Sequence, residues 1–290
     1  MKPWIVIPVH NRRALTLACA QNLDTVGAFQ KSHVLVVDDG STDGTAQALG
    51  ETFPQIEILR GSGDLWWTGA ITAGMSHAFA HGASAVCWLN DDCHLQLDTL
   101  DRLQTIAREN PRALIAPTCV ADATGQPISA GGFVGRSAIG AIDEPMLEVD
   151  GVSGFCLWVT REVWQAVGAP DAKSFPHYYG DTAYMLAAKR AGCRIILLRD
   201  VRVTLVDYRE RAATPGQYVL QKRASGQSKK LWDDTFSSKR SPFRLATMFA
   251  YLRLRYGAVT GTALAMVRFC AWQWSWLSAR RKPLRESTAA

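Results

Sequence analysis

The residues best suited to chemistry are two adjacent carboxylates, Asp91 and Asp92, directly after the apolar run 85–89. That run predicts a buried strand, and like charges side by side at its end repel each other unless a cation lies beside them. Hard divalent ions such as Mg²⁺ take carboxylate oxygens and keep room for substrate phosphates. The pair therefore predicts a metal and diphosphate site, against the alternative of a loop with solvated carboxylates.

Two further polar stretches follow apolar, β-branched runs. His10 and Asn11 follow the run 4–9, and Asp38 with Asp39 follows the run 33–37. Carboxylates only accept hydrogen bonds, so Asp38 and Asp39 suit a base N–H or a ribose hydroxyl. Together with the acidic pair, these stretches predict a site for a nucleotide diphosphate.

The elements that position these residues alternate along the first 110 residues. Strands are predicted at 4–9, 33–37, 56–59 and 85–89, with helical patterns at 14–29, 45–51 and 70–81 between them. This alternation predicts an α/β fold with a doubly wound, mainly parallel sheet flanked by helices. Ligands of such sheets bind outside the carboxyl ends of the strands, which is where all three polar stretches fall.

Composition limits the class of protein. With 290 residues, 48% of them hydrophobic and 20% charged, the chain is long enough for one large domain or two smaller ones. Its seven cysteines show no CxxC or CxxH spacing, which indicates reduced thiols in a cytoplasmic protein and no zinc site. The sequence enters its first strand within four residues, so we expect no signal peptide.

Charge is concentrated at the C-terminus. Residues 239–290 hold ten Lys or Arg and one acidic residue, whereas the rest holds 22 basic and 25 acidic residues. Basic residues are thus not interleaved across the fold as nucleic-acid binding would require. We predict a polar loop or lid at 209–242, then a basic helical tail at 243–290.

The tail includes a stretch close to membrane-spanning length. Residues 258–279 carry a single charge, Arg268, but Gly257, Gly261 and that central arginine disfavour a span. Amphipathic helices on the inner face of the cell membrane, with basic residues against anionic lipid, are the favoured interpretation. The alternative is that the helices pack on the catalytic domain or on another subunit.

Four stretches in order, VIPVHNR, VLVVDDGSTDGT, GDLWWTGAITAG and WLNDDC, closely resemble the family 2 glycosyltransferases with the GT-A fold. Later stretches, GFCLWVTREVWQAVGAPD and FPHYYGDTAYMLAAKRAGCRI, are similar to the acceptor half of that family. The resemblance covers residues 3–208. It implies a GT-A catalytic domain at 1–208, with a nucleotide-binding half at 1–95 and an acceptor half at 96–208.

The resemblance implies a metal-dependent, inverting transfer of a sugar from a nucleotide diphosphate to a hydroxyl group. The acceptor would be a glycan or a lipid-linked saccharide in surface polysaccharide synthesis. By position, the implied nucleotide-binding residues are Pro8, Val9, His10, Asn11, Asp38, Asp39, Asp64, Gly69, Asn90 and Asp91. Those implied to contact the donor or acceptor sugar are Trp66, Trp67, His177 and Tyr178. Asp91 would lie near the ribose, and Asp92 would bind Mn²⁺ or Mg²⁺.

Asp181 matches the catalytic base of the family. Inverting transfer needs a carboxylate or histidine that takes the proton of the acceptor hydroxyl. The alternative is a helix N-cap, because Asp181 directly precedes a helical pattern that Gly192 would end. For His10, packing at the strand end is as good an interpretation as nucleotide contact, and one of Trp66 and Trp67 is expected in the core.

The chain also departs from the family pattern. Ala183 and Ala187 stand where relatives often carry an acidic residue and an arginine, and no histidine follows His177. Asp207 is a possible replacement for the usual metal-binding histidine. These losses leave open a non-catalytic, transferase-like domain that binds nucleotide or glycan as a scaffold. A nucleotidyltransferase is disfavoured, since residues 10–13 lack the Gly-rich loop with a lysine.

Overall fold

The structure, a computed structural model, describes residues 1–128, 132–134, 137–138, 144–206, 208, 212–226 and 230–281. The chain divides into two compact units. The first, called the catalytic unit because it contains the predicted base Asp181, comprises residues 1–176 and 180–208. The second, the C-terminal unit, comprises residues 177–179 and 209–290.

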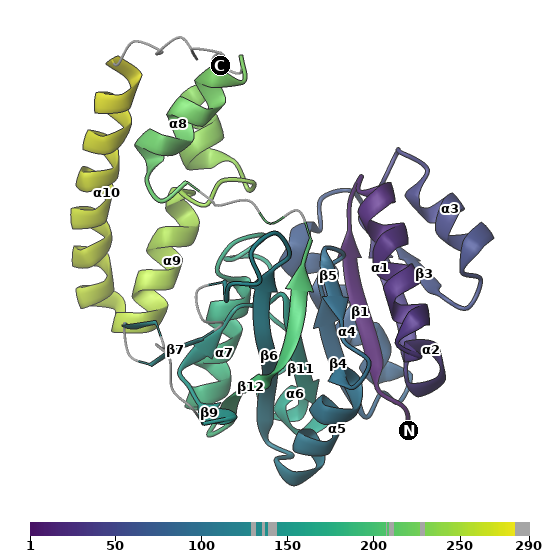
Figure 1. The fold of residues 1–290 in the computed structure, drawn as a ribbon. Coiled ribbons are helices and arrows are strands. Elements are labelled where there is room, and N and C mark those ends of the chain that lie inside the picture. The colour runs from purple at the N-terminus through teal and green to yellow at the C-terminus, as the bar shows by residue number, and fades with distance from the viewer. Residues whose placement is uncertain are drawn as a thin grey trace. The chain divides into compact units, whose positions relative to one another are not determined.

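The predicted nucleotide-binding half forms the parallel strands that the sequence predicts. Strand β1 (Trp4–Val9) lies between β2 (His33–Asp38) and β4 (Ala85–Leu89), and β3 (Glu57–Arg60) pairs with β2. All three pairings are parallel, so the polar stretches after β1, β2 and β4 emerge at one edge of the sheet (Figure 1). This edge is the expected position of a ligand site.

Helices α1 (Arg13–Thr25), α2 (Ala28–Lys31), α3 (Thr45–Thr52) and α4 (Trp66–Ala80) connect these strands. The predicted helix at 14–29 is divided at Gly27, whose φ of 69° is a left-handed conformation that glycine adopts without strain. The predicted helix at 70–81 begins four residues earlier, at Trp66. Both members of the tryptophan pair therefore lie in the first turn of α4, at the carboxyl edge.

The second half of the catalytic unit extends the same sheet. Its strands are β5 (Cys93–Leu95), β6 (Ala113–Ala121), β9 (Met146–Glu148), β11 (Cys156–Thr160) and β12 (Arg194–Leu205). The strand order is β3-β2-β1-β4-β11-β6-β12-β5, with β9 also on β12. Because β11 runs antiparallel to both β4 and β6, the sheet is mixed, although the predicted α/β class is confirmed.

Helices α5 (Thr99–Glu109), α6 (Arg161–Val167) and α7 (Gly180–Arg190) belong to this half. A small separate sheet contains β7 (Gly132–Val134), β8 (Ser137–Ala138) and β10 (Gly151–Val152).

The core lies on both faces of the sheet. In β1, Ile5 and Ile7 face the side of α1, and Val6 faces the side of α4. Helix α4 approaches this strand closely at Gly74, where an added Cβ would lie 2.3 Å from Cγ1 of Val6. Glycine at this point lets α4 pack directly against β1. This packing sets where the first turn of α4, which contains both tryptophans, lies relative to the carboxyl ends of the strands.

The C-terminal unit is helical, with α8 (Pro215–Ala224), the π-helix η2 (Asp233–Ser237), α9 (Leu245–Tyr256) and α10 (Ala258–Arg281). The segment predicted as a polar loop or lid thus contains a regular helix. Thr214 caps α8 by accepting a hydrogen bond from the N–H of Gln217, and Val219 is buried with Phe236 and Trp276. Tertiary packing therefore stabilises a helix whose own sequence is polar.

The predicted tail contains α9 and α10, and its last residues, 282–290, lie outside the described residues. None of the helices in the described ranges combines the length and apolar character needed to cross a bilayer.

Candidate functional site

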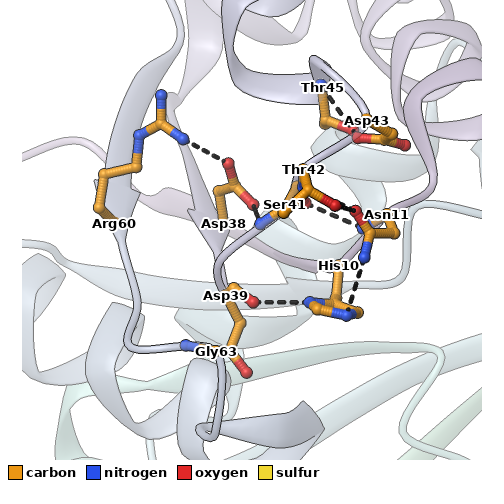
Figure 2. Close-up of polar contacts among 10 residues, drawn as sticks. All are labelled: His10, Asn11, Asp38, Asp39, Ser41, Thr42, Asp43, Thr45, Arg60 and Gly63. Carbon is orange, nitrogen blue, oxygen red and sulfur yellow. Dashed lines mark hydrogen bonds and ion pairs between the residues drawn. The ribbon is translucent and has the colours of Figure 1, made fainter.

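The loops after β1 and β2 are held together by side chains of His10 and Asn11 (Figure 2). Nδ1 of His10 lies 2.6 Å from the carbonyl oxygen of Asp39; a carbonyl only accepts, so Nδ1 carries the hydrogen. Nε2 is then free to accept from the Asn11 amide at 3.0 Å. Asn11, at φ 53°, also accepts from the N–H of Thr42 through Oδ1, and its own backbone N–H donates to Ser41 Oγ. Both predicted residues are exposed at the sheet edge.

Asp38 is fully buried and serves its own loop. One carboxylate oxygen accepts from the N–H of Ser41 at 2.9 Å, and the other forms an ion pair of 2.9 Å with Arg60. In the same loop, Asp43 accepts a hydrogen bond from the Thr45 hydroxyl (Figure 2). This bond is the largest of the effects that lower the pKa of Asp43. Asp38 therefore holds its own loop in place, and its predicted role in binding base or ribose stays a prediction.

Asp39 likewise binds backbone groups. Its oxygens accept from the N–H of Gly63 at 2.7 Å and from the N–H of Trp66 at 2.9 Å. These bonds hold the turn before α4 against the end of β2. Asp39 therefore positions the predicted nucleotide-contacting turn, and each oxygen retains a lone pair for a further donor.

The cation beside the acidic pair is Arg12. Its Nη1 lies 2.8 Å from Oδ1 of Asp91, and its Nη2 lies 3.1 Å from Oδ2 of Asp92. Asp91 is 1% exposed and also accepts from the Thr16 hydroxyl at 3.1 Å. Burial raises the pKa of Asp91 to about 6, while Arg12 lowers it and the charge of Asp92 raises it. The carboxylate of Asp91 thus faces Arg12 and Thr16 of α1, and its expected contact with a ribose stays a prediction.

Asp92 is the accessible carboxylate of the pair, with 22% of its side chain exposed. Within the parts of the chain that the structure describes, no three His, Cys, Asp or Glu side chains gather where they could hold a metal ion. Asp207 lies outside the described residues. Mg²⁺ is commonly bound by one or two carboxylates with substrate phosphates. The residues therefore fit an ion held by Asp92 together with a donor diphosphate.

A continuous rim connects the acidic motif to Asp181. Asn90 accepts a hydrogen bond of 2.8 Å from the indole N–H of Trp67, whose ring also packs edge-on against Trp88. At Gly154 an added Cβ would lie 2.7 Å from Cβ of Asp181 and 3.1 Å from the ring of Trp67. Only the absence of a side chain at Gly154 allows the predicted base and this tryptophan to lie so close together.

Asp181 lies in the first turn of α7. Oδ2 accepts from the N–H of Gly154 at 2.9 Å, and Oδ1 accepts from the N–H of Thr182 at 2.7 Å. The carboxylate is half-buried, so these bonds fix its orientation without closing it off. This arrangement is compatible with both sequence interpretations, since Asp181 contacts the start of the helix and presents a carboxylate at the rim.

The remaining predicted residues divide into two groups. Trp66, at φ 60°, donates through its indole N–H to the exposed Asp64 at 2.6 Å. Of the two tryptophans, Trp67 is the one that packs on the hydrophobic core. Val9 and Gly69 are buried, the latter against Leu65, so both have packing roles; Pro8 is half-buried in β1.

His177 and Tyr178 belong to the C-terminal unit, not to the catalytic unit that contains the other predicted residues. Their rings contact each other edge-on, and the adjacent Tyr179 packs against Tyr251 of α9 at a centroid distance of 4.7 Å. Three functional candidates, Arg12, Arg60 and Gly154, have no signal in the sequence spacing. Only the three-dimensional pairing identifies them.

Comparison with known families agrees with this geometry. Residues 4–129, which contain β1 to β6 and the acidic motif, match the family model described as Glycosyl transferase family 2. No curated protein matches the chain in sequence.

Three solved structures share the fold. GalNAc-T7, in a structure with UDP, GalNAc and Mn²⁺, has a TM-score of 0.60 at 12% identity, covering 93% of this chain and 54% of that one. TarS 1–349 of S. aureus, with UDP-GlcNAc, has a TM-score of 0.59 at 15% identity over 96% and 79%. The mannosyltransferase PcManGT of Pyrobaculum calidifontis, with GDP-Man and Mn²⁺, has a TM-score of 0.54 at 17% identity over 93% and 76%. The chain thus spans little more than half the length of GalNAc-T7.

Proposed function

Because residues 4–129 match the family 2 glycosyltransferase model and the chain shares its fold with solved glycosyltransferases, we propose that it is a GT-A glycosyltransferase that transfers a sugar from a nucleotide diphosphate to a saccharide hydroxyl with inversion at the anomeric carbon. The observation that carries this proposal is the rim from Asn90 through Trp67 and Gly154 to Asp181. It supports a single site in which the acidic motif binds the donor diphosphate and Asp181 faces the acceptor.

In this site Asp181 acts as the general base. Its carboxylate takes the proton of the acceptor hydroxyl as the acceptor oxygen bonds to the anomeric carbon, while the bond from that carbon to the diphosphate oxygen breaks. The nucleoside diphosphate leaves with the bonding electron pair, so one attack gives inversion. The backbone N–H groups of Gly154 and Thr182 keep the base oriented. Oδ1 also accepts from the Thr182 hydroxyl, so Oδ2 is the oxygen that retains a lone pair for the proton.

Asp92 would hold Mn²⁺ or Mg²⁺ together with the donor diphosphate. The bound ion would neutralise charge on the leaving diphosphate. Arg12, already within 3.1 Å of Asp92, adds a fixed positive charge at the same edge of the sheet. The exposed side chains of His10, Asn11 and Asp64 are the candidate contacts for the nucleoside.

The acceptor is proposed to be a glycan or a lipid-linked saccharide in the synthesis of a surface polysaccharide. The reaction would take place at the inner face of the cell membrane. Support comes from the C-terminal unit, because its sequence from residue 239 onwards holds ten basic residues and one acidic residue. A basic surface of this kind favours contact with anionic lipid.

The test compares wild type with Asp181→Asn in donor binding and in transfer. Calorimetric titration with UDP, GDP and dTDP, each with Mn²⁺, Mg²⁺ or EDTA, should identify one nucleotide bound with metal. Asp181→Asn should bind it equally well yet lose transfer to a saccharide acceptor by about 100-fold or more, the contribution typical of a general base. Asp98→Asn, at an exposed position outside the site, is the control for the same loss of charge. Full transfer by Asp181→Asn, or no nucleotide bound by wild type, would refute the proposal.

A further inference from the structure

Helix α10 carries a long apolar stripe on its exposed side. Val259 is 85%, Val267 69% and Trp274 76% exposed, and Met266 and Leu277 lie on the same side. Residues at separations of 7, 11, 15 and 18 face one direction on an α-helix, since 3.6 residues complete a turn. The outer stripe of α10 consists of Val259, Ala263, Met266, Val267, Cys270, Trp274 and Leu277. At 1.5 Å per residue it is about 27 Å long.

The opposite face of α10 already holds the C-terminal unit together. Gly261 and Ala265 are buried, and a Cβ at Gly261 would lie 2.4 Å from the carbonyl oxygen of Leu252 in α9. Trp276 and Ala279 are buried in the cluster that includes Val219 of α8. Within this unit, Figure 1 shows α8 and α9 along one side of α10. The outer stripe therefore has no part in the packing of its own unit.

Single exposed apolar residues are ordinary, but a continuous apolar stripe marks an interaction surface. A helix that is apolar on all sides is normally covered on all sides. In α10 the covered face uses small residues with Trp272 and Trp276, whereas the outer stripe has a third tryptophan, Trp274, near its C-terminal end. Tryptophan at the end of an apolar stripe suits the boundary between acyl chains and water.

Charge decides which partner fits. The sequence contains no acidic residue between Asp234 and Glu286, and Arg280 and Arg281 end α10 beside the last residues of the stripe. A second copy of this chain would bring two such basic segments together, which like-charge repulsion disfavours. An anionic lipid surface has the complementary charge. An apolar stripe with arginines at its end suits a helix that lies in the interface between headgroups and acyl chains.

We propose that the outer stripe of α10 is a docking surface for an anionic membrane, with the helix lying parallel to the bilayer. Its side chains enter the region between headgroups and acyl chains, and the arginines at its C-terminal end contact lipid phosphates. The biological purpose of docking rests on the proposed function, because an enzyme docked at the membrane meets acceptors that are displayed there. Docking itself requires no transfer and is measured separately.

The experiment is flotation of the full chain with vesicles of phosphatidylcholine alone and of phosphatidylcholine with about one third phosphatidylglycerol. Wild type should bind the anionic vesicles at least about tenfold more strongly, and the binding should weaken with salt. Met266→Glu with Trp274→Glu places two carboxylates in the stripe and should reduce binding by about tenfold or more. The matched control, Thr262→Glu with Arg268→Gln, changes the charge equally at exposed positions outside the stripe and should keep binding within about threefold.

Nucleotide titration and light scattering on the same proteins separate the outcomes. Equal nucleotide binding by both variants shows that the substitutions leave the catalytic unit folded. Absence of wild-type binding to either vesicle would overturn the docking surface, as would a wild-type dimer that the stripe variant alone converts to monomer. Vesicle binding without any nucleotide binding would instead refute the proposed function and leave the docking surface intact.

Discussion

Arg12→Gln tests whether the acidic motif depends on its guanidinium partner. Arg12 contacts both acids, and the Asp91 side chain is only 2% exposed, whereas that of Arg12 is 38% exposed. Breaking a fully buried pair costs about 3–5 kcal/mol, and breaking a surface pair costs about 0–1 kcal/mol. With one partner buried and the other partly exposed, we expect a loss of about 2 kcal/mol in the free energy of unfolding.

The assay is urea and thermal unfolding of the nucleotide-free protein in EDTA. A loss of about 2 kcal/mol corresponds to a fall in Tm of about 4–8 °C for a domain of this size. The matched control is Arg13→Gln, which removes the same charge from the adjacent, exposed position. Arg13 contributes its backbone N–H to Asp43, and this bond survives the substitution. We expect the control to change stability by less than about 0.5 kcal/mol.

A double-mutant cycle with Asp91→Asn isolates the interaction between the two side chains. If Arg12 stabilises chiefly by neutralising Asp91, the double variant should be less destabilised than the sum of the two single variants, by about 1 kcal/mol or more. Equal stability of Arg12→Gln and Arg13→Gln, or strict additivity in the cycle, would refute the assignment of Arg12 as the counterion of the buried acid.

Two further substitutions test the rim. Gly154→Ala should lower kcat by about 10- to 100-fold, because the added Cβ displaces Asp181 or Trp67, and should change nucleotide affinity by less than about twofold. Gly50→Ala is the control, since an added Cβ there meets nothing within 4 Å. An unchanged kcat in Gly154→Ala would contradict the close approach of Asp181 and Trp67. Trp67→Phe removes the 2.8 Å hydrogen bond to Asn90 but keeps an aromatic ring near Trp88, so unfolding should show a loss of about 1 kcal/mol and nucleotide titration a weaker affinity. An unchanged titration would separate Asn90 from the donor site.

The strands of the nucleotide-binding half are predictable because their signal is local. A parallel strand buried on both faces requires a continuous apolar run, and the runs at 4–9, 33–37 and 85–89 have this character. The common position of the polar stretches then follows from the geometry of a parallel sheet. Predicting α8 was not possible on the same basis, because its burial depends on residues such as Trp276, 57 positions after Val219 in the chain.

The partners of the site carboxylates were less predictable than their positions. Arg12 and Asp92 are 80 residues apart, and Arg60 is 22 residues from Asp38. Such pairs depend on which strands are neighbours and at which register, information that no single segment contains. Gly154 is similar, since its requirement for no side chain arises from Asp181 and Trp67, on two other elements.

The partners explain how the carboxylates of the site are held in place. Asp38, Asp39 and Asp181 each accept a hydrogen bond from at least one backbone N–H of the site loops. A charged acceptor on a backbone N–H is among the stronger protein hydrogen bonds, so these acids fix the loops before any ligand arrives. Loss of nucleotide binding in an Asp39 variant would therefore reflect movement of the turn at Gly63 and Trp66 as well as loss of a direct contact. Asp92 has an accessible carboxylate, which among the described residues contacts Arg12 and, weakly, the Cys93 thiol. It is therefore the acid whose substitution reports on ligand binding most directly.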